Sequence, residues 1–158
     1  MGKARKEHAS REALPRLVIA DDDPVVRSVL IEQLKHDFEC VAEASDADQA
    51  IAAVATYDPA VVILDVDMPA GGAIHATRQI CAQSPGTAVV ILSIDETWAD
   101  VIDLMNTGAM TYLRKGVDEP TLVHDLKAAI EAHGRRNHRV GERPVGSSAW
   151  STAFAGDG

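Results

Sequence analysis

Short runs of β-branched and aliphatic residues alternate with segments that carry apolar residues at helical spacing, and this alternation limits the fold most. Five runs predict strands, at residues 17–20, 41–44, 60–64, 88–92 and 110–113. Runs that are apolar throughout indicate strands buried on both faces, as in a parallel sheet covered by helices on each side. The sequence therefore predicts an α/β fold, a doubly wound five-stranded parallel sheet, (βα)5, with right-handed crossovers.

The segments that follow the five runs predict five amphipathic helices. Asp118 and Pro120 mark the start of the last helix, and Gly134 marks its end. We expect one domain over 16–134, with a flexible leader at 1–15 and a flexible tail at 135–158, because neither end has the composition to bury a core. The apolar helix positions are Val26, Val29, Leu30 and Leu34; Ala50, Ile51 and Val54; Ile74, Thr77, Ile80 and Cys81; Val101, Ile102 and Met105; and Leu122, Leu126, Ala129 and Ile130.

The charge of the chain is unevenly distributed. Residues 17–134 hold 20 Asp and Glu against 6 Lys and Arg, although the net charge of the whole chain is −9. An acidic body argues against binding to DNA and favours a hard cation. No apolar stretch reaches the roughly 18 residues of a membrane span, and the isolated Cys40 and Cys81 fit reduced thiols. We expect a cytoplasmic protein that binds neither DNA nor a membrane.

Polar side chains follow the predicted strands at the points where these strands end. Because the carboxyl ends of parallel strands meet at one edge, we expect these side chains to form one site. Gathered carboxylates repel each other unless a cation joins them, and oxygen ligands favour Mg²⁺. A carboxylate in such a site can attack phosphorus while a lysine neutralises charge on the phosphoryl oxygens. The residues are Asp21 and Asp22, Asp65 and Asp67, Ser93, and Lys115.

Four segments carry a resemblance to a known family. LVIADDDP, VVILDVDMP, VVILS and GAMTYLRK, in this order and spacing, resemble the receiver domains of bacterial two-component response regulators. The resemblance covers residues 16–134. It implies the flavodoxin-like receiver fold with strand order 2-1-3-4-5.

The resemblance also implies roles for individual residues. Asp65 would accept the phosphoryl group, Ser93 would hydrogen-bond to it, and Lys115 would pair with it. Ser93 and Tyr112 would form a switch that changes the face made by the fourth helix, the fifth strand and the fifth helix. Mg²⁺ would be held by Asp21, Asp22, Asp65 and the backbone carbonyl of Asp67.

The implied function is a signalling receiver phosphorylated by a histidine kinase or a phosphotransfer protein. A downstream protein would bind the switch face, and a phosphorylation-dependent homodimer is compatible with the resemblance. Beyond its own phosphorylation and slow autodephosphorylation, we expect no enzyme activity.

Two alternatives stay open. The first is a truncated receiver of a DNA-binding response regulator, although the residues after Gly134 are too few for a helix-turn-helix module. The second is a phosphatase of the haloacid dehalogenase type, whose nucleophile motif the sequence DVD resembles. In that family the acidic pair comes late in the chain, whereas Asp21 and Asp22 come first here.

Three further residues near the site have simple interpretations. Asp23 stands before Pro24 and is expected to cap a helix rather than bind metal. Ile94 follows Ser93 where receivers usually have a small residue, and we hypothesise that it slows attack by water on the phosphorylated Asp65. Trp98 is expected to be an anchor for a protein partner.

Overall fold

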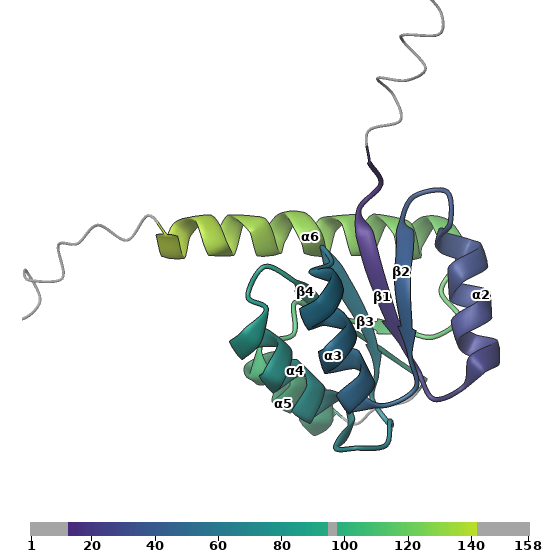
Figure 1. The fold of residues 1–158 in the computed structure, drawn as a ribbon, viewed down its shortest axis with the longest axis horizontal. Helices are drawn as coiled ribbons and strands as arrows, with labels where there is room; N and C mark the ends of the chain where they lie inside the picture. The colour runs from purple at the N-terminus through teal and green to yellow at the C-terminus, as the bar shows by residue number, and fades with distance from the viewer. Residues whose placement is uncertain (1–12, 95–97, 142–158) are drawn as a thin grey trace, which may run out of the picture.

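The fold is a parallel sheet with helices on both faces (Figure 1). A computed structural model describes residues 13–94 and 98–141. All neighbouring strands pair in parallel, in the order β2-β1-β3-β4-β5, which confirms the predicted topology. The elements are β1 Arg16–Ala20, α2 Pro24–Leu34, β2 Glu39–Ala44, α3 Ala47–Tyr57, β3 Val61–Asp65, α4 Gly72–Gln83, β4 Ala88–Ser93, α5 Trp98–Thr107, β5 Thr111–Arg114 and α6 Glu119–Gly141.

The period of two along each strand divides the core into two layers. Leu17, Ile63 and Leu92 face one side, where they pack with residues of α2 and α6. Val62 and Ile91 face the other side, where they pack with residues of α3, α4 and α5. Every residue of β3 and β4 is buried, so these strands form the buried centre on which the site is built.

The predicted apolar helix faces are only partly correct. Leu30 and Leu34 of α2 are buried as expected, but Val29 is 50% exposed. On α5, Ile102 and Met105 were predicted to face the core and are exposed, whereas Leu104 is buried. Apolar spacing identified these helices, but it did not fix which side packs on the sheet, because single apolar residues are common on protein surfaces.

Helix α6 continues through Gly141, and this corrects the predicted helix end at Gly134 and a flexible tail from residue 135. A glycine inside a helix costs only about 1 kcal/mol relative to alanine. His133 Nε2 and Asn137 Nδ2 lie 2.7 and 2.6 Å from the carbonyl oxygen of Pro85, which ties the helix to the α4–β4 loop on both sides of the glycine. The end of α6 projects beyond the rest of the fold (Figure 1).

The ends of the chain and one loop lie outside the described residues. These are residues 1–12, 95–97 and 142–158, together with the side chains of Trp98, Arg139 and Val140. The expected role of Trp98 as an anchor therefore stays a prediction. In the described part of the chain, no helix combines the length and the apolar character needed to cross a membrane.

Candidate functional site: a carboxylate cluster paired with a lysine

The predicted site residues converge at the carboxyl ends of four strands. Asp21 follows β1, Asp65 ends β3, Ser93 ends β4 and Lys115 follows β5. They line one open cavity of about 350 Å³. The other residues around this cavity are Asp22, Asp23, Val26, Asp67 and Ile94.

Hydrogen bonds hold the loop between β1 and α2 in place. The backbone N–H of Asp21 donates to the carbonyl oxygen of Ala44, and Asp21 Oδ1 accepts from the N–H of Asp23. The carboxylate of Asp23 accepts from the N–H of Val25 at 2.9 Å and caps α2, whose first residue is Pro24. The expectation that Asp23 serves as a helix cap is therefore confirmed.

The ammonium of Lys115 lies between two buried carboxylates. Its Nζ atom is 2.8 Å from Asp21 Oδ2 and 2.9 Å from Asp65 Oδ1. Burial alone would lower the pKa of Lys115, but its contacts with Asp21 and Asp65 outweigh burial and raise that pKa. Lys115 therefore carries its positive charge at neutral pH and offsets part of the repulsion between the carboxylates.

The environment of Asp65 disfavours its charged form. Burial raises the pKa of the Asp65 carboxyl, the ion pair with Lys115 opposes that rise, and the charges of Asp21 and Asp22 add to it. Asp65 is 8% exposed, so water screens these charges poorly. A buried carboxylate with a raised pKa in an open cavity is a common property of reactive groups.

Three of the carboxylates can meet at one cation. Single oxygen atoms of Asp21, Asp22 and Asp65 all lie within 4.8 Å of one another. Oδ2 of Asp21 is buried and lies 2.8 Å from the ammonium of Lys115. Oxygen ligands of this kind fit Mg²⁺ or a similar hard ion. Asp67 is exposed and lines the same cavity.

Ser93 and Tyr112 lie on the same face of the sheet, on neighbouring strands. Ser93 is opposite Arg114 and Ile91 is opposite Tyr112, so the serine and the tyrosine are one side-chain repeat apart along the sheet. Ser93 is buried, and Tyr112 is partly buried against the layer that includes Leu104 of α5.

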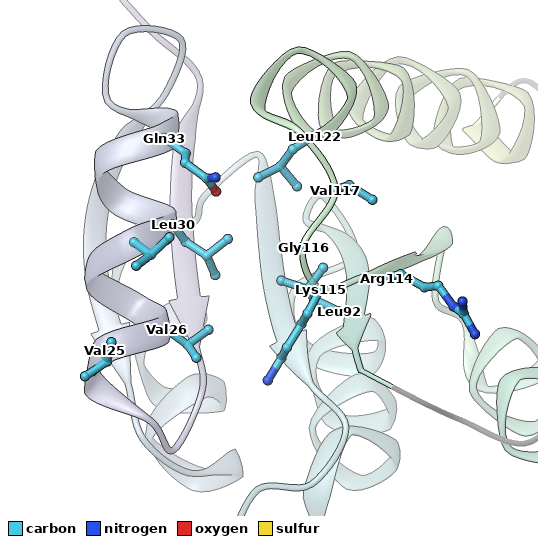
Figure 2. A pocket seen from close by; sticks show the side chains of 11 residues that line it. Val25, Val26, Leu30, Gln33, Leu92, Arg114, Lys115, Gly116, Val117 and Leu122 are labelled. Atoms are coloured by element: carbon cyan, nitrogen blue, oxygen red, sulfur yellow. The ribbon is translucent and has the colours of Figure 1, made fainter.

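An apolar pocket adjoins the charged cavity and was not foreseen in the sequence. Figure 2 shows it between α2 and the segment from β5 to α6. Its volume is about 200 Å³. Val26 and Lys115 line both the pocket and the charged cavity. Val25 and Val29, at i and i+4 on α2, are 68% and 50% exposed on its rim. Together with Val26 and Leu30, they make an apolar surface on α2 that is wider than one buried helix face. This wide apolar surface was the signal in the sequence that could have indicated the pocket.

Sequence reasoning also gave no role to Arg27. Its Nη1 atom donates to the carbonyl oxygen of Asp21 at 2.6 Å, and its Nε atom donates to Glu43 Oε1 at 3.1 Å. An arginine one turn after an acidic loop is too common to attract notice. Only the fold, which places β2 beside β1, brings Glu43 within reach.

Comparisons with known proteins agree with this geometry. The family model for the response regulator receiver domain matches residues 17–127. The chain is 31% identical over 118 residues to the transcriptional regulatory protein DegU of Brevibacillus brevis, covering 73% of this chain and 50% of that protein. It is 34% identical over 122 residues to the transcriptional regulatory protein PdtaR of Mycobacterium tuberculosis, covering 75% and 57%.

A solved structure shows the same fold. The signal receiver domain of the response regulator NarL from Mycobacterium tuberculosis superposes with a TM-score of 0.73, covering 76% of this chain and 98% of that domain. Its sequence identity is 23%, so this likeness concerns the fold alone. The chain spans about half the length of the curated relatives that it matches.

Proposed function

The chain belongs to the response regulator receiver domain family, and from this premise we propose that its phosphorylation-dependent signalling uses Asp65 as the phosphoryl acceptor. One observation carries the assignment. The Asp65 carboxylate ends a fully buried strand, lines an open cavity, and lies 2.9 Å from the ammonium of Lys115. It thus combines a reactive oxygen with a positive charge beside it.

In the proposed transfer, a carboxylate oxygen of Asp65 forms a bond to phosphorus as the bond from phosphorus to the donor breaks. The donor's nitrogen or oxygen leaves with the bonding electrons. The Lys115 ammonium neutralises charge on the phosphoryl oxygens, and the Ser93 hydroxyl donates a hydrogen bond to one of them. Hydrolysis later returns Asp65 to the carboxylate, and this slow reaction is the only turnover that we expect.

Asp21, Asp22, Asp65 and the backbone carbonyl of Asp67 are the proposed holders of Mg²⁺. The supporting observation is the cluster of carboxylate oxygens from Asp21, Asp22 and Asp65, which all lie within 4.8 Å of one another. When bound, Mg²⁺ would neutralise negative charge on the carboxylates and on the incoming phosphoryl group. Lys115 supplies part of that neutralisation from the chain itself.

The output of the domain is proposed to be a population shift. Phosphorylation would draw Ser93 inward and let Tyr112 change its rotamer, which would alter the face of α5, β5 and α6. A downstream protein would bind this face, and a homodimer formed through it is the second arrangement that we propose to test.

The phosphoryl donor is proposed to be a histidine kinase or a phosphotransfer protein in the cytoplasm. Such a donor must bring its phosphohistidine to Asp65, and the apolar pocket beside Lys115 offers a contact surface within reach (Figure 2). The relatives are named as transcriptional regulators, so a chain with a DNA-binding module is the alternative output. The family match disfavours the haloacid dehalogenase interpretation.

The test is intact-protein mass spectrometry after incubation with acetyl phosphate and Mg²⁺. We expect a single phosphoryl adduct on the wild type and none on Asp65→Ala. Asp67→Asn is the matched control, because it removes a nearby exposed carboxylate and should keep the adduct. An adduct that persists in Asp65→Ala, or a folded wild type that forms none, would contradict the proposal.

A further inference from the structure

Arg27 connects three segments that meet beside the carboxylate cluster. It lies in the first turns of α2, and its side chain is 17% exposed. The guanidinium donates through Nη1 to the carbonyl oxygen of Asp21 and through Nε to Glu43 of β2. One planar group thus links the end of β1, the start of α2 and the adjacent strand.

The bond to the Asp21 carbonyl controls a specific part of the backbone. That carbonyl belongs to the planar peptide unit that joins Asp21 to Asp22, so the direction of the oxygen fixes the plane of the whole unit. On one side of this unit the N–H of Asp21 is held by Ala44. On the other side the N–H of Asp23 is held by Asp21 Oδ1. Arg27 therefore fixes the link between the two acidic residues of the cluster.

Glu43 fixes the guanidinium in turn. Its carboxylate is 3.1 Å from Nε of Arg27, and its strand is paired with β1, with Ile19 opposite Glu43. An arginine presents several N–H donors in one rigid plane, so it can serve the Asp21 carbonyl and Glu43 together. A lysine has one compact ammonium and would lose this two-pronged geometry.

We propose that Arg27, held by Glu43, is a positioning residue that orients Asp21 and Asp22 for divalent-cation binding. This inference rests on the proposed function, because it names a residue that prepares the same site. Arg27 acts through the backbone of the acidic loop and touches neither Asp65 nor the phosphoryl group. Its loss should weaken the affinity for the metal first, and the transfer to Asp65 as a consequence.

The primary test is titration of the full chain with Mn²⁺, following free Mn²⁺ by electron paramagnetic resonance without a phosphoryl donor. We expect Arg27→Lys to bind Mn²⁺ about ten-fold more weakly than the wild type, as is typical when a group that orients metal ligands is lost. Glu43→Gln keeps an amide oxygen that can accept from Nε and should stay close to the wild type. Glu43→Ala should fall between the two.

A matched control lies on the same helix. Lys35 and Glu32 form an exposed pair at the far end of α2, so Lys35→Ala removes a surface ion pair of α2 without touching the acidic loop. It should leave Mn²⁺ affinity unchanged. Melting temperatures measured without metal separate a loss of affinity from a loss of folding.

A second readout separates positioning from a merely structural role. If Arg27 acts on metal affinity, the slower formation of the phosphoryl adduct in Arg27→Lys should be restored when Mg²⁺ is saturating. Wild-type Mn²⁺ affinity in Arg27→Lys would overturn the inference, as would a slow transfer that saturating Mg²⁺ leaves uncorrected. If Arg27→Lys does not fold, Glu43→Ala decides: weaker Mn²⁺ binding supports the inference and unchanged binding overturns it. Absence of the adduct in the wild type would contradict the proposed function. The Mn²⁺ titration would still test whether Arg27 positions the acidic loop for metal binding.

Discussion

The Nζ atom of Lys115 lies 2.9 Å from Oδ1 of Asp65, so the proposed phosphoryl acceptor and a positive charge are in direct contact. Asp65 is the last residue of the buried central strand β3, and Lys115 directly follows the edge strand β5. Their contact sets the electrostatics of the site, and two of the following predictions depend on it.

Replacing Lys115 by alanine should slow phosphorylation of Asp65. The ammonium contacts Asp65 and would neutralise charge on the phosphoryl oxygens. Loss of one such stabilising donor typically lowers a rate by about 100-fold. The measurement is the rate of adduct formation with acetyl phosphate at saturating Mg²⁺. Lys127→Ala is the control, since its ammonium pairs with Asp37 on the surface. Equal rates for the two variants would show that Lys115 has no part in the transfer.

The raised pKa of Asp65 predicts a stability that depends on pH when Mg²⁺ is absent. Between the ordinary and the raised pKa, the folded state binds more protons at Asp65 than the unfolded state does, so stability falls as pH rises through that window. Asp65→Asn has no carboxyl group at this position, so it does not lose stability in this way. We expect the two proteins to be nearly equally stable at the acid end and the variant to be more stable by about 1 kcal/mol at neutral pH.

Urea unfolding at a series of pH values checks this expectation, with Asp67→Asn as an exposed control. Lys115 keeps its charge throughout, because its own pKa is raised. A stability difference that shrinks as pH rises would mean that the ion pair with Lys115 outweighs burial. Addition of Mg²⁺ should stabilise the wild type more than Asp65→Asn, since only the wild type keeps all three carboxylates of the cluster.

Ile94 is expected to lengthen the lifetime of the phosphoryl group. Ile94 is 73% exposed and lines the charged cavity, so it lies beside the approach to Asp65 without belonging to the core. Ile94→Ala should therefore fold normally and lose phosphate faster, by up to about ten-fold if the side chain contributes roughly 1.4 kcal/mol to the barrier. Decay of the adduct is measured by mass spectrometry, with Ile102→Ala on α5 as the control. An unchanged decay rate would remove Ile94 from the mechanism.

The fold and the centre of the site could be predicted because they depend on local patterns. Residues 61–64 and 88–92 are apolar throughout, which indicated central strands, and parallel strands bring Asp65 and Ser93 to one edge. The end of a strand restricts the position of the side chain that follows it. The charged residues after each run were therefore sufficient to locate the site.

Contacts between distant segments were beyond the reach of these patterns. Arg27 gains its role only because Glu43 lies on the neighbouring strand, which no local spacing reveals. Val29 was assigned to the core although the pocket beside Lys115 leaves it half exposed. In both cases the sequence shows a residue that suits several environments, and the packing of other elements decides among them.

The loop between β3 and α4 contains an alanine in the left-handed region, with Ala70 at φ 67° ahead of Gly71 at φ 103°. A residue with a Cβ atom is strained there, whereas glycine is not. Ala70→Gly should raise the free energy of unfolding by about 0.5 kcal/mol, because relief of strain exceeds the added entropy of the unfolded chain. Ala52→Gly, on an exposed position of α3, should instead lower it by about 1 kcal/mol. Equal losses in both variants would show that Ala70 is unstrained.

The continuation of α6 beyond Gly134 predicts that alanine in place of this glycine stabilises the protein. A Cβ atom at this position would meet no atom within 4 Å, and residues on both sides are helical. Gly134→Ala should therefore raise the free energy of unfolding by about 0.5 to 1 kcal/mol, through a more restricted unfolded chain and a better helix. Gly116→Ala is the control, since φ there is 91° and the substitution should destabilise although space is open. If the helix ended at Gly134 with a left-handed cap, Gly134→Ala would also destabilise, so urea unfolding of the two variants distinguishes a continuous α6 from the end that the sequence suggested.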